Sequence, residues 1–344
     1  MGAVSLGCAV ALLGSALVSL PARAADPIRS PQPISYALDL AFTQPATLSG
    51  TETIKFRNNS ETKLDAVWIR LWANGSGGCR RASTVSVVAG GTMVRERERC
   101  TAVEIKLVKP VIPGAEGEIA LRFKATAPRL YERFGRLYGG AVAFGNAVPI
   151  LAVQDNGRWQ LPPYSELGES FYSLSSKWQA RIRLPRGLKA ATTGNVRSTT
   201  SLPDGATELE VSTEDARDFA LSIGNYEVRE AVVAGVKLRY FVIKSGTEQL
   251  RRVHAATFES AKQSFAQFVE RFGSYGAPEL DIVDSLSPNL IIKRIEGERV
   301  KLGRSVDMEY PEMVFASIDS AAHEVAHQWW YGIVGDDSFK EAWL

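Results

Sequence analysis

The sequence predicts an α+β protein of more than one domain, in which an all-β N-terminal part precedes a mixed α/β part. Three observations support this fold class. The chain has 344 residues, of which 45% are hydrophobic and 23% charged, enough for about two domains with full cores. From residue 36 to about residue 230, apolar and polar residues alternate in short segments. Beyond residue 247 the apolar spacing changes to that of a helix.

Residues 1–24 have the features of a secretory signal peptide. Residues 9–20 are almost wholly apolar, and Pro21-Ala-Arg-Ala24 ends in small residues of the kind that signal peptidase recognises. The first eight residues contain no Lys or Arg, which is unusual for such a segment. We expect cleavage after Ala24 and export to the periplasm or the extracellular space. We expect no integral membrane span after cleavage, because about a dozen apolar residues cannot cross roughly 30 Å of hydrocarbon.

Residues 25–230 are expected to form an N-terminal β-sheet domain. Segments such as Tyr36–Phe42 and Gln179–Leu184 alternate with a period of two, and turn sequences such as Pro203-Asp-Gly205 separate them. This pattern is typical of antiparallel strands. Cys79 and Cys100 fall in this domain, and an oxidising compartment would allow them to form a disulfide. Their spacing alone does not distinguish a disulfide from two unrelated thiols.

Residues 231–344 are expected to form the second domain. A strand pattern over Val236–Val242 leads to a helix whose apolar residues recur at spacings of three and four from Leu250 to Phe272. His254 lies on or beside this apolar stripe. It is expected to be structural, because no acidic residue or histidine lies one turn away. The formal net charge of +2 without a basic stripe argues against nucleic acid as a partner.

The pattern that carries chemistry is His323-Glu-Val-Ala-His327. The chain has three histidines, and two of them lie four residues apart with Glu324 directly after the first. Residues i and i+4 project from one face of a helix, so both imidazoles can bind one Zn²⁺. Glu324 lies next to that face and can take a proton from a water molecule that attacks a peptide carbonyl.

The motif is expected on a buried helix. Ser317 or Asp319 can cap its start, Gly332 can end it, and several neighbours are apolar: Ile318, Ala321, Ala322, Val325, Ala326 and Trp329. Burial is what a preorganised metal site requires. The alternative is a surface helix with incidental histidines, which the rarity of the motif disfavours.

With its flanking residues, the motif resembles that of the gluzincin zinc aminopeptidases of the aminopeptidase N family. The similarity covers His323–Gly332, then Val334-Gly335 and Lys340-Glu-Ala-Trp-Leu344. It implies a saddle-shaped N-terminal β domain, a thermolysin-like α/β catalytic domain, one Zn²⁺ per chain and peptide substrates.

The resemblance also implies a third zinc ligand. In the family a glutamate follows the second histidine after eighteen intervening residues, and here Gln328 to Leu344 supplies seventeen. We therefore expect the ligand at the second position past Leu344, and a catalytic domain that is incomplete at its C-terminus. Glu341 is not a substitute, because it lies five residues short, about 500° of helical rotation.

A second similarity lies in Val306-Asp-Met-Glu-Tyr310, which resembles the family's Gly-Ala-Met-Glu-Asn exopeptidase motif. Met308 and Glu309 are kept, whereas Val306 and Asp307 replace two small residues. The resemblance implies that Glu309 binds the α-amino group of the substrate, for which a carboxylate is a suitable partner. The alternative is a Met-Glu-Tyr-Pro turn with a structural role.

Together these features predict an exported zinc metallopeptidase, and within that class an aminopeptidase. His323 and His327 are the predicted metal ligands, Glu324 the catalytic base and Glu309 the substrate-binding residue. Two alternatives stay open. One is a zinc endopeptidase on the same scaffold, which the altered Val306-Asp307 allows. The other is a non-catalytic binding protein that keeps the fold, because a site without its third ligand would bind zinc poorly.

Overall fold

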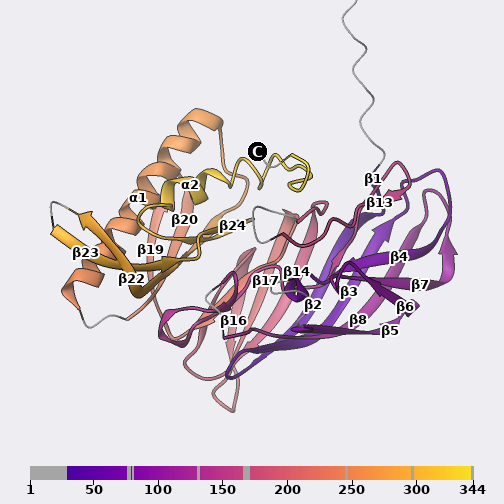
Figure 1. Ribbon diagram of the computed structural model, residues 1–344, viewed down its shortest axis with the longest axis horizontal. Helices are drawn as coiled ribbons and strands as arrows, with labels where there is room; N and C mark the ends of the chain where they lie inside the picture. Colours follow the sequence, from indigo (N-terminus) through magenta and orange to yellow (C-terminus); the bar gives the residue numbers. More distant parts are fainter. Residues whose placement is uncertain are drawn as a thin grey trace, which may run out of the picture.

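The computed structural model describes residues 29–75, 79, 81–129, 132–165, 171–244, 247–295 and 298–341, with the backbone alone described over 286–305. The predicted signal peptide, residues 1–24, lies outside the described residues. Most of the described chain is β-structure, and its sheets fall into two parts that lie side by side (Figure 1). The prediction of a strand-rich N-terminal part is thereby confirmed.

The N-terminal part is dominated by a curved seven-stranded sheet (Figure 1). Its neighbouring strands are antiparallel except for β14 and β2, which run parallel. In spatial order the strands are β16 (Asn195–Ser201), β17 (Thr207–Ala216), β14 (Ser176–Leu184), β2 (Gln32–Thr43), β3 (Thr47–Arg57), β8 (Glu116–Thr126) and β5 (Ser83–Ala89).

Smaller sheets cover one face of this sheet. One has the order β11 (Ile150–Leu151), β4 (Leu64–Arg70), β7 (Ala102–Val111), β6 (Gly91–Arg97). A second has the order β15 (Lys189–Thr192), β18 (Leu221–Gly224), β10 (Val142–Phe144), β9 (Phe134–Arg136). A third joins β1 (Arg29–Ser30), β12 (Gln154–Asp155) and β13 (Arg158–Trp159), and two 3₁₀ turns lie at Trp72–Asn74 and Tyr138–Gly140.

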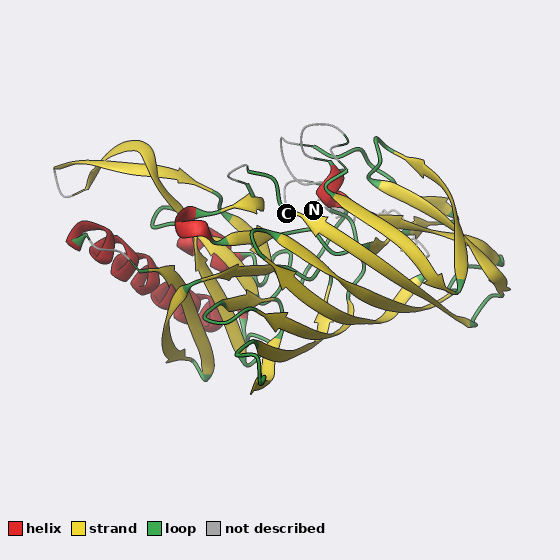
Figure 2. Cartoon of the chain, turned by 90° about the horizontal axis from the view of Figure 1, so that it is seen from below, coloured by secondary structure: helices red, strands yellow, loops and turns green. Residues whose placement is uncertain are grey.

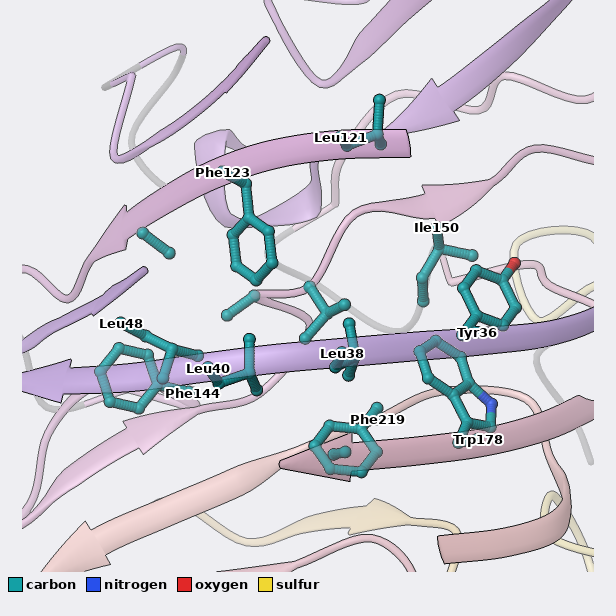
Figure 3. Packing of buried hydrophobic residues seen from close by; sticks show 14 of the residues in the cluster. Tyr36, Leu38, Leu40, Leu48, Leu121, Phe123, Phe144, Ile150, Trp178 and Phe219 are labelled. Atoms are coloured by element: carbon teal, nitrogen blue, oxygen red, sulfur yellow. The ribbon is translucent and has the colours of Figure 1, made fainter. Parts of the chain in front are cut away.

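The core of the N-terminal part lies between these layers, where the apolar members of each alternating strand point inward (Figure 3). At its centre the rings of Tyr36 and Trp178 stack with their centroids 3.9 Å apart. The indole nitrogen of Trp178 donates a 2.7 Å hydrogen bond to the carbonyl oxygen of Ala216. Burial of these large rings therefore leaves their polar atoms paired, as burial requires.

Cys79 and Cys100 form a disulfide, with their Cα atoms 5.5 Å apart. The bridge lies beside the turn that joins β6 to β7, and Cys100 is buried. Of the two possibilities that the spacing left open, the structure shows the disulfide.

The C-terminal part is a five-stranded sheet covered by two helices. Its order is β19 (Tyr226–Val233), β20 (Val236–Ile243), β21 (Glu279–Asp284), β25 (Met313–Ala316), β24 (Met308–Tyr310), followed by a separate hairpin of β22 (Leu286–Ile295) and β23 (Glu298–Ser305). Helix α1 (Glu248–Phe272) connects the parallel strands β20 and β21, and the short α2 (Ala321–Ala326) follows β25. The thermolysin-like character of this part stays a prediction.

Helix α1 confirms the predicted amphipathic pattern. Thr247 caps its first turn by accepting a hydrogen bond from the Leu250 amide, and Gly273 ends it with φ of 97°, in the left-handed region. Its apolar stripe packs on the sheet and on α2 through a core that includes Phe258, Ala261, Phe265, Leu280, Ile282, Val325 and Trp329. The buried stripe therefore fixes the position of the segment that carries the histidine motif.

A buried apolar cluster joins the two parts. It contains side chains from both: Trp72, Leu137, Ala141, Ala143, Phe171, Ala191, Ala220, Tyr226, Phe241, Val283, Met308, Tyr310, Met313 and Phe315. Because β19 already pairs with β20, the change of sheet falls at Tyr226, while a domain boundary between residues 230 and 231 stays a prediction.

Seen from below, α1 lies at one end of the molecule and the large sheet extends to the other (Figure 2). The segment after α2 reaches back to the N-terminal part, where the Lys340 ammonium donates a 2.7 Å hydrogen bond to the Gln160 side chain. In the part of the chain that the structure describes, no helix is both long enough and apolar enough to cross a membrane.

Candidate functional site

The histidine motif lies on a shorter helix than the sequence predicts. Helix α2 ends at Ala326, and His327 is its C-cap. Beyond this point the hydrogen bonds change from the α-helical pattern, since the Gln328 amide donates to Val325 and the Gly332 amide donates to His327. Tyr331 has φ of 109°, which a helix cannot accommodate. The predicted continuation of the helix to Gly332 is therefore wrong.

Packing explains this early end. Trp329 is buried, and its ring lies 5.6 Å from that of Phe265 on α1, while its indole nitrogen donates to the carbonyl of Gly273 over 3.2 Å. The start also differs from the prediction, because no side chain caps the helix and Ala322 is exposed rather than buried. The helix thus has one buried face and one exposed face.

The two motif histidines lie on the exposed face with their ring nitrogens facing each other. Nε2 of His323 and Nε2 of His327 are 3.1 Å apart, and the two rings are almost perpendicular at 88°. Two ligands of one tetrahedral zinc ion at about 2.0 Å would lie roughly 3.3 Å apart. The separation found here therefore fits a pair of ligands to a single ion.

The other nitrogen of His327 orients its ring. Nδ1 lies 3.0 Å from the carbonyl oxygen of Trp330. Because a carbonyl oxygen only accepts, Nδ1 is the donor in this contact, and the tautomer with its proton on Nδ1 directs the electron pair of Nε2 toward His323. Histidine ligands of metals commonly donate their other N–H in this way.

Glu324 lies on the inner side of the helix and is buried, with an exposed fraction of 4%. Glu309 comes from strand β24, which pairs with β25 so that Glu309 lies opposite Val314. One carboxylate oxygen of each and one ring nitrogen of His327 all lie within 4.8 Å of one another. The structure therefore brings all four predicted site residues to one place, although Glu309 comes from strand β24 and the other three come from α2 and its C-cap.

Asp307 is a residue whose place in the site the sequence did not reveal. Its carboxylate accepts hydrogen bonds from Ser285 Oγ at 2.5 Å and from Ser317 Oγ at 3.1 Å. Partial desolvation and the adjacent His327 lower the pKa of His323, and the charge of Asp307 acts in the opposite direction. A lowered pKa keeps this imidazole neutral, the form that binds a metal. The only signal in the sequence was that Asp307, two residues before Glu309, replaces a small residue of the motif that this segment resembles.

His254 plays no part in this site. It is buried on α1, and its Nε2 lies 3.4 Å from Oδ2 of Asp284 at the end of β21. The acidic partner comes from another element, not from the next helical turn. The structure agrees with a structural histidine, and it shows an acidic neighbour that spacing along the helix did not reveal.

The residues present fit a zinc ion in donor type and arrangement. The two imidazoles are separated by the distance expected of two ligands to one ion, and a hydrogen bond from Nδ1 orients the ring of His327. Carboxylates of Glu309 and Glu324 lie beside His327. The third ligand that the family resemblance places beyond Leu344 is not part of this sequence.

Comparisons with known proteins support the fold. No family model matches the sequence, and no curated protein matches it. Among solved structures, the chain is similar to a glutamate-to-alanine mutant of an M1 zinc metallopeptidase from Deinococcus radiodurans, with a TM-score of 0.55 and 18% sequence identity. The match covers 87% of this chain and 64% of the other, so the chain spans less than two thirds of the length of that structure. At this identity the likeness shows a shared fold, that of an M1 metallopeptidase structure over most of the chain.

Proposed function

We propose that this protein is a zinc-dependent metallopeptidase and, within that class, an aminopeptidase acting on peptides. The observation that carries the proposal is the pair of Nε2 atoms of His323 and His327, 3.1 Å apart, with the buried Glu324 carboxylate within 4.8 Å of the His327 ring. His323 and His327 would hold the ion, together with the ligand expected past Leu344. When bound, zinc supplies a positive charge that polarises a carbonyl and makes water more acidic.

The roles of the protein side chains follow from their positions. Glu324, whose carboxylate lies within 4.8 Å of the His327 ring, would accept the proton of the attacking water and pass it to the leaving amine. Glu309, within 4.8 Å of the Glu324 carboxylate, would bind the α-ammonium group of the peptide and align its first bond with the site.

The signal-like residues 1–24 support export of the protein to the periplasm or beyond. No nucleic-acid partner is proposed, in keeping with the near-neutral charge of +2. An endopeptidase on the same scaffold remains the second candidate, because Asp307 stands where the resembling motif has a small residue.

Glu324→Gln tests the assignment in the natural full-length protein. Hydrolysis of peptides should fall by at least a thousandfold while the zinc content stays at one ion per chain, because the amide keeps the shape but cannot take the proton. Glu270→Gln, on the exposed face of α1, is the matched control and should leave activity unchanged. Full activity of the Glu324 variant would refute the proposed role.

A further inference from the structure

A second pocket, of about 280 Å³, opens at the junction of the two parts of the molecule. Its walls come from strands β16 and β17, from the loop ahead of β21, from the turn between β24 and β25, and from the segment after α2, where Gln328, Gly332 and Ile333 line it. None of His323, Glu324, His327 or Glu309 lines it. The pocket is therefore separate from the candidate metal site.

The inner end of this pocket presents hydrogen-bond acceptors. Glu312 is 9% exposed, and its carboxylate accepts hydrogen bonds from Thr213 Oγ1 and, over 3.4 Å, from Asn195 Nδ2. Asn195 is 6% exposed, and among the described residues its Oδ1 has no hydrogen-bond partner. A buried acceptor that stays unsatisfied costs free energy. A ligand that donates hydrogen bonds would satisfy both groups.

The charges around the pocket favour a cation. Glu312, Glu214 and Asp215 line it with Arg197 as the single basic residue among the lining residues. Burial, and after it the nearby Asp281, raise the pKa of Glu312 to about 7, while the bond from Thr213 acts against them. The described residues form no ion pair with Glu312, and the positive charge that acts on it is that of the exposed Arg197, which lowers its pKa. The carboxylate thus lacks the buried cationic partner that would offset its desolvation.

The backbone at Glu312 is held in an unfavourable conformation. Its φ is 61°, in the left-handed region where glycine or asparagine is less strained. Its amide donates a 2.9 Å hydrogen bond to Oε1 of Gln328, and its carbonyl accepts one from the Asp281 amide at 3.0 Å. These bonds hold the glutamate side chain at the pocket end.

The rest of the pocket is less polar. Tyr275, Pro278 and Pro311 line it together with Ala277. An aromatic ring and proline rings beside a carboxylate suit a ligand with a charged head and a short apolar body. We propose that this pocket binds a small primary amine, with its ammonium group on Glu312 and Asn195 and its apolar body against Tyr275 and Pro311.

The pocket is connected to the candidate site through one side chain. Gln328, which directly follows His327, accepts hydrogen bonds from the Glu312 amide and the Tyr275 hydroxyl, and donates one of 3.0 Å to the Tyr310 carbonyl. A bound amine would contact Glu312 and Tyr275, two of the three residues to which Gln328 is hydrogen-bonded. It would therefore also stabilise the segment that carries His327.

Calorimetric titration with benzylamine and with benzyl alcohol tests the proposal, at a mildly alkaline pH where the carboxylate and the amine are both charged. The amine should bind at least tenfold more tightly than the uncharged alcohol, because charge-assisted hydrogen bonds are the stronger kind. Glu312→Gln should weaken amine binding at least tenfold and leave alcohol binding unchanged.

Two further variants separate this site from its alternatives. Arg197→Ala removes an exposed cation at the pocket and should tighten amine binding, a change that loss of folding cannot produce. Glu309→Gln should leave amine binding unchanged, whereas a loss of binding there would assign the amine to the candidate metal site. Absence of amine binding, or equal binding of the alcohol, would overturn the proposal. None of these readouts depends on peptidase activity.

Discussion

The hydroxyl group of Tyr310 donates a 3.0 Å hydrogen bond to Oδ1 of Asn146, and this bond joins strand β24 to the turn that follows β10. Asn146 in turn donates to Oδ2 of Asp218 over 2.5 Å, and all three residues are buried. Gly145 provides the room, since a Cβ there would lie 1.9 Å from the Tyr310 hydroxyl oxygen. Glu309 precedes Tyr310 in β24, so its position depends on the N-terminal part.

Tyr310→Phe should therefore affect both stability and the candidate site. Loss of the hydroxyl leaves a buried Asn146 acceptor unpaired, which costs about 1–3 kcal/mol of unfolding free energy. We also expect a higher KM for peptides, because β24 would hold Glu309 less firmly. Denaturant unfolding and steady-state kinetics measure the two effects.

Tyr172→Phe is the matched control for that variant. The Tyr172 hydroxyl donates to Asp155 over 2.9 Å and accepts from Arg29 over 3.1 Å, in the small sheet of β1, β12 and β13. This variant should lose stability with no change in KM. Equal effects of the two variants on KM would show that the Tyr310 bond does not position Glu309.

Glu309→Gln separates two roles for this carboxylate. As the anchor of an α-ammonium group, its loss should raise KM for free peptides roughly 10- to 100-fold, the equivalent of a charge-assisted hydrogen bond. N-acetylated peptides should be cleaved slowly by both proteins, with little difference between them. Zinc content should not change.

The same variant tests an alternative that the geometry allows. The carboxylate of Glu309 lies close enough to His327 and Glu324 to share a metal ion with them. Loss of zinc from the Glu309 variant would assign the residue to the metal. Efficient cleavage of N-acetylated peptides by the unmodified protein would instead favour an endopeptidase.

The sequence predicted elements whose signal is local. The strands of the N-terminal part and α1 follow from alternation and from a helical stripe, because burial of one face determines both patterns. The size of the large sheet and its parallel pair of β14 and β2 do not follow from alternation. The end of α2 did not follow, because the packing of Trp329 against Phe265 overrides the local preference for continued helix. Gly332 looked like a helix end and lies in a turn instead.

In the candidate site, too, the sequence predicted what depends on local spacing and did not predict what depends on contacts between distant segments. The spacing of His323 and His327 predicted that they face each other, since helical geometry alone places them so. The environment of Asp307 could not be predicted, because Ser285 and Ser317 reach it from separate segments that only the folded chain brings together. The link from Glu312 to Thr213 and Asn195 crosses between the two parts of the molecule and has no local signal.

Stability should depend on pH through the buried carboxyl group of Glu312. Burial raises its pKa from the usual range to about 7, so the folded state binds its proton more tightly than the unfolded state does. The stabilisation is complete below the unfolded pKa and is lost as the pH rises through about 7. The unfolding free energy should therefore fall between about pH 4.5 and 7.5, by at most about 3 kcal/mol for this group.

Glu312→Gln is the control for this pH dependence. The glutamine cannot titrate, so the fall over that interval should shrink by the share that Glu312 contributes. The remaining dependence should come from Asp218 and Asp281, whose pKa values burial also raises to about 7. An unchanged pH profile in the variant would show that Glu312 is not protonated in the folded state.

The three histidines of the chain allow a direct test of which ones bind the metal. His327→Ala should lower zinc affinity more than about a hundredfold, because it removes a ligand together with the Nδ1 contact to the Trp330 carbonyl that orients it. His254→Ala should leave zinc affinity unchanged. It should instead lower the unfolding free energy by about 2 kcal/mol, since it leaves a cavity and a buried Asp284 without its imidazole.

Competition with a chromogenic chelator measures zinc affinity, and denaturant unfolding of the metal-free proteins measures stability. His327→Ala should show the large loss of zinc affinity, and His254→Ala should show the large loss of stability. His323→Ala should behave like His327→Ala in affinity, because the two Nε2 atoms face the same point. Equal loss of zinc affinity in His254→Ala would show that destabilisation of the fold is enough to release zinc. The losses in His323→Ala and His327→Ala would then not identify these two residues as the metal ligands.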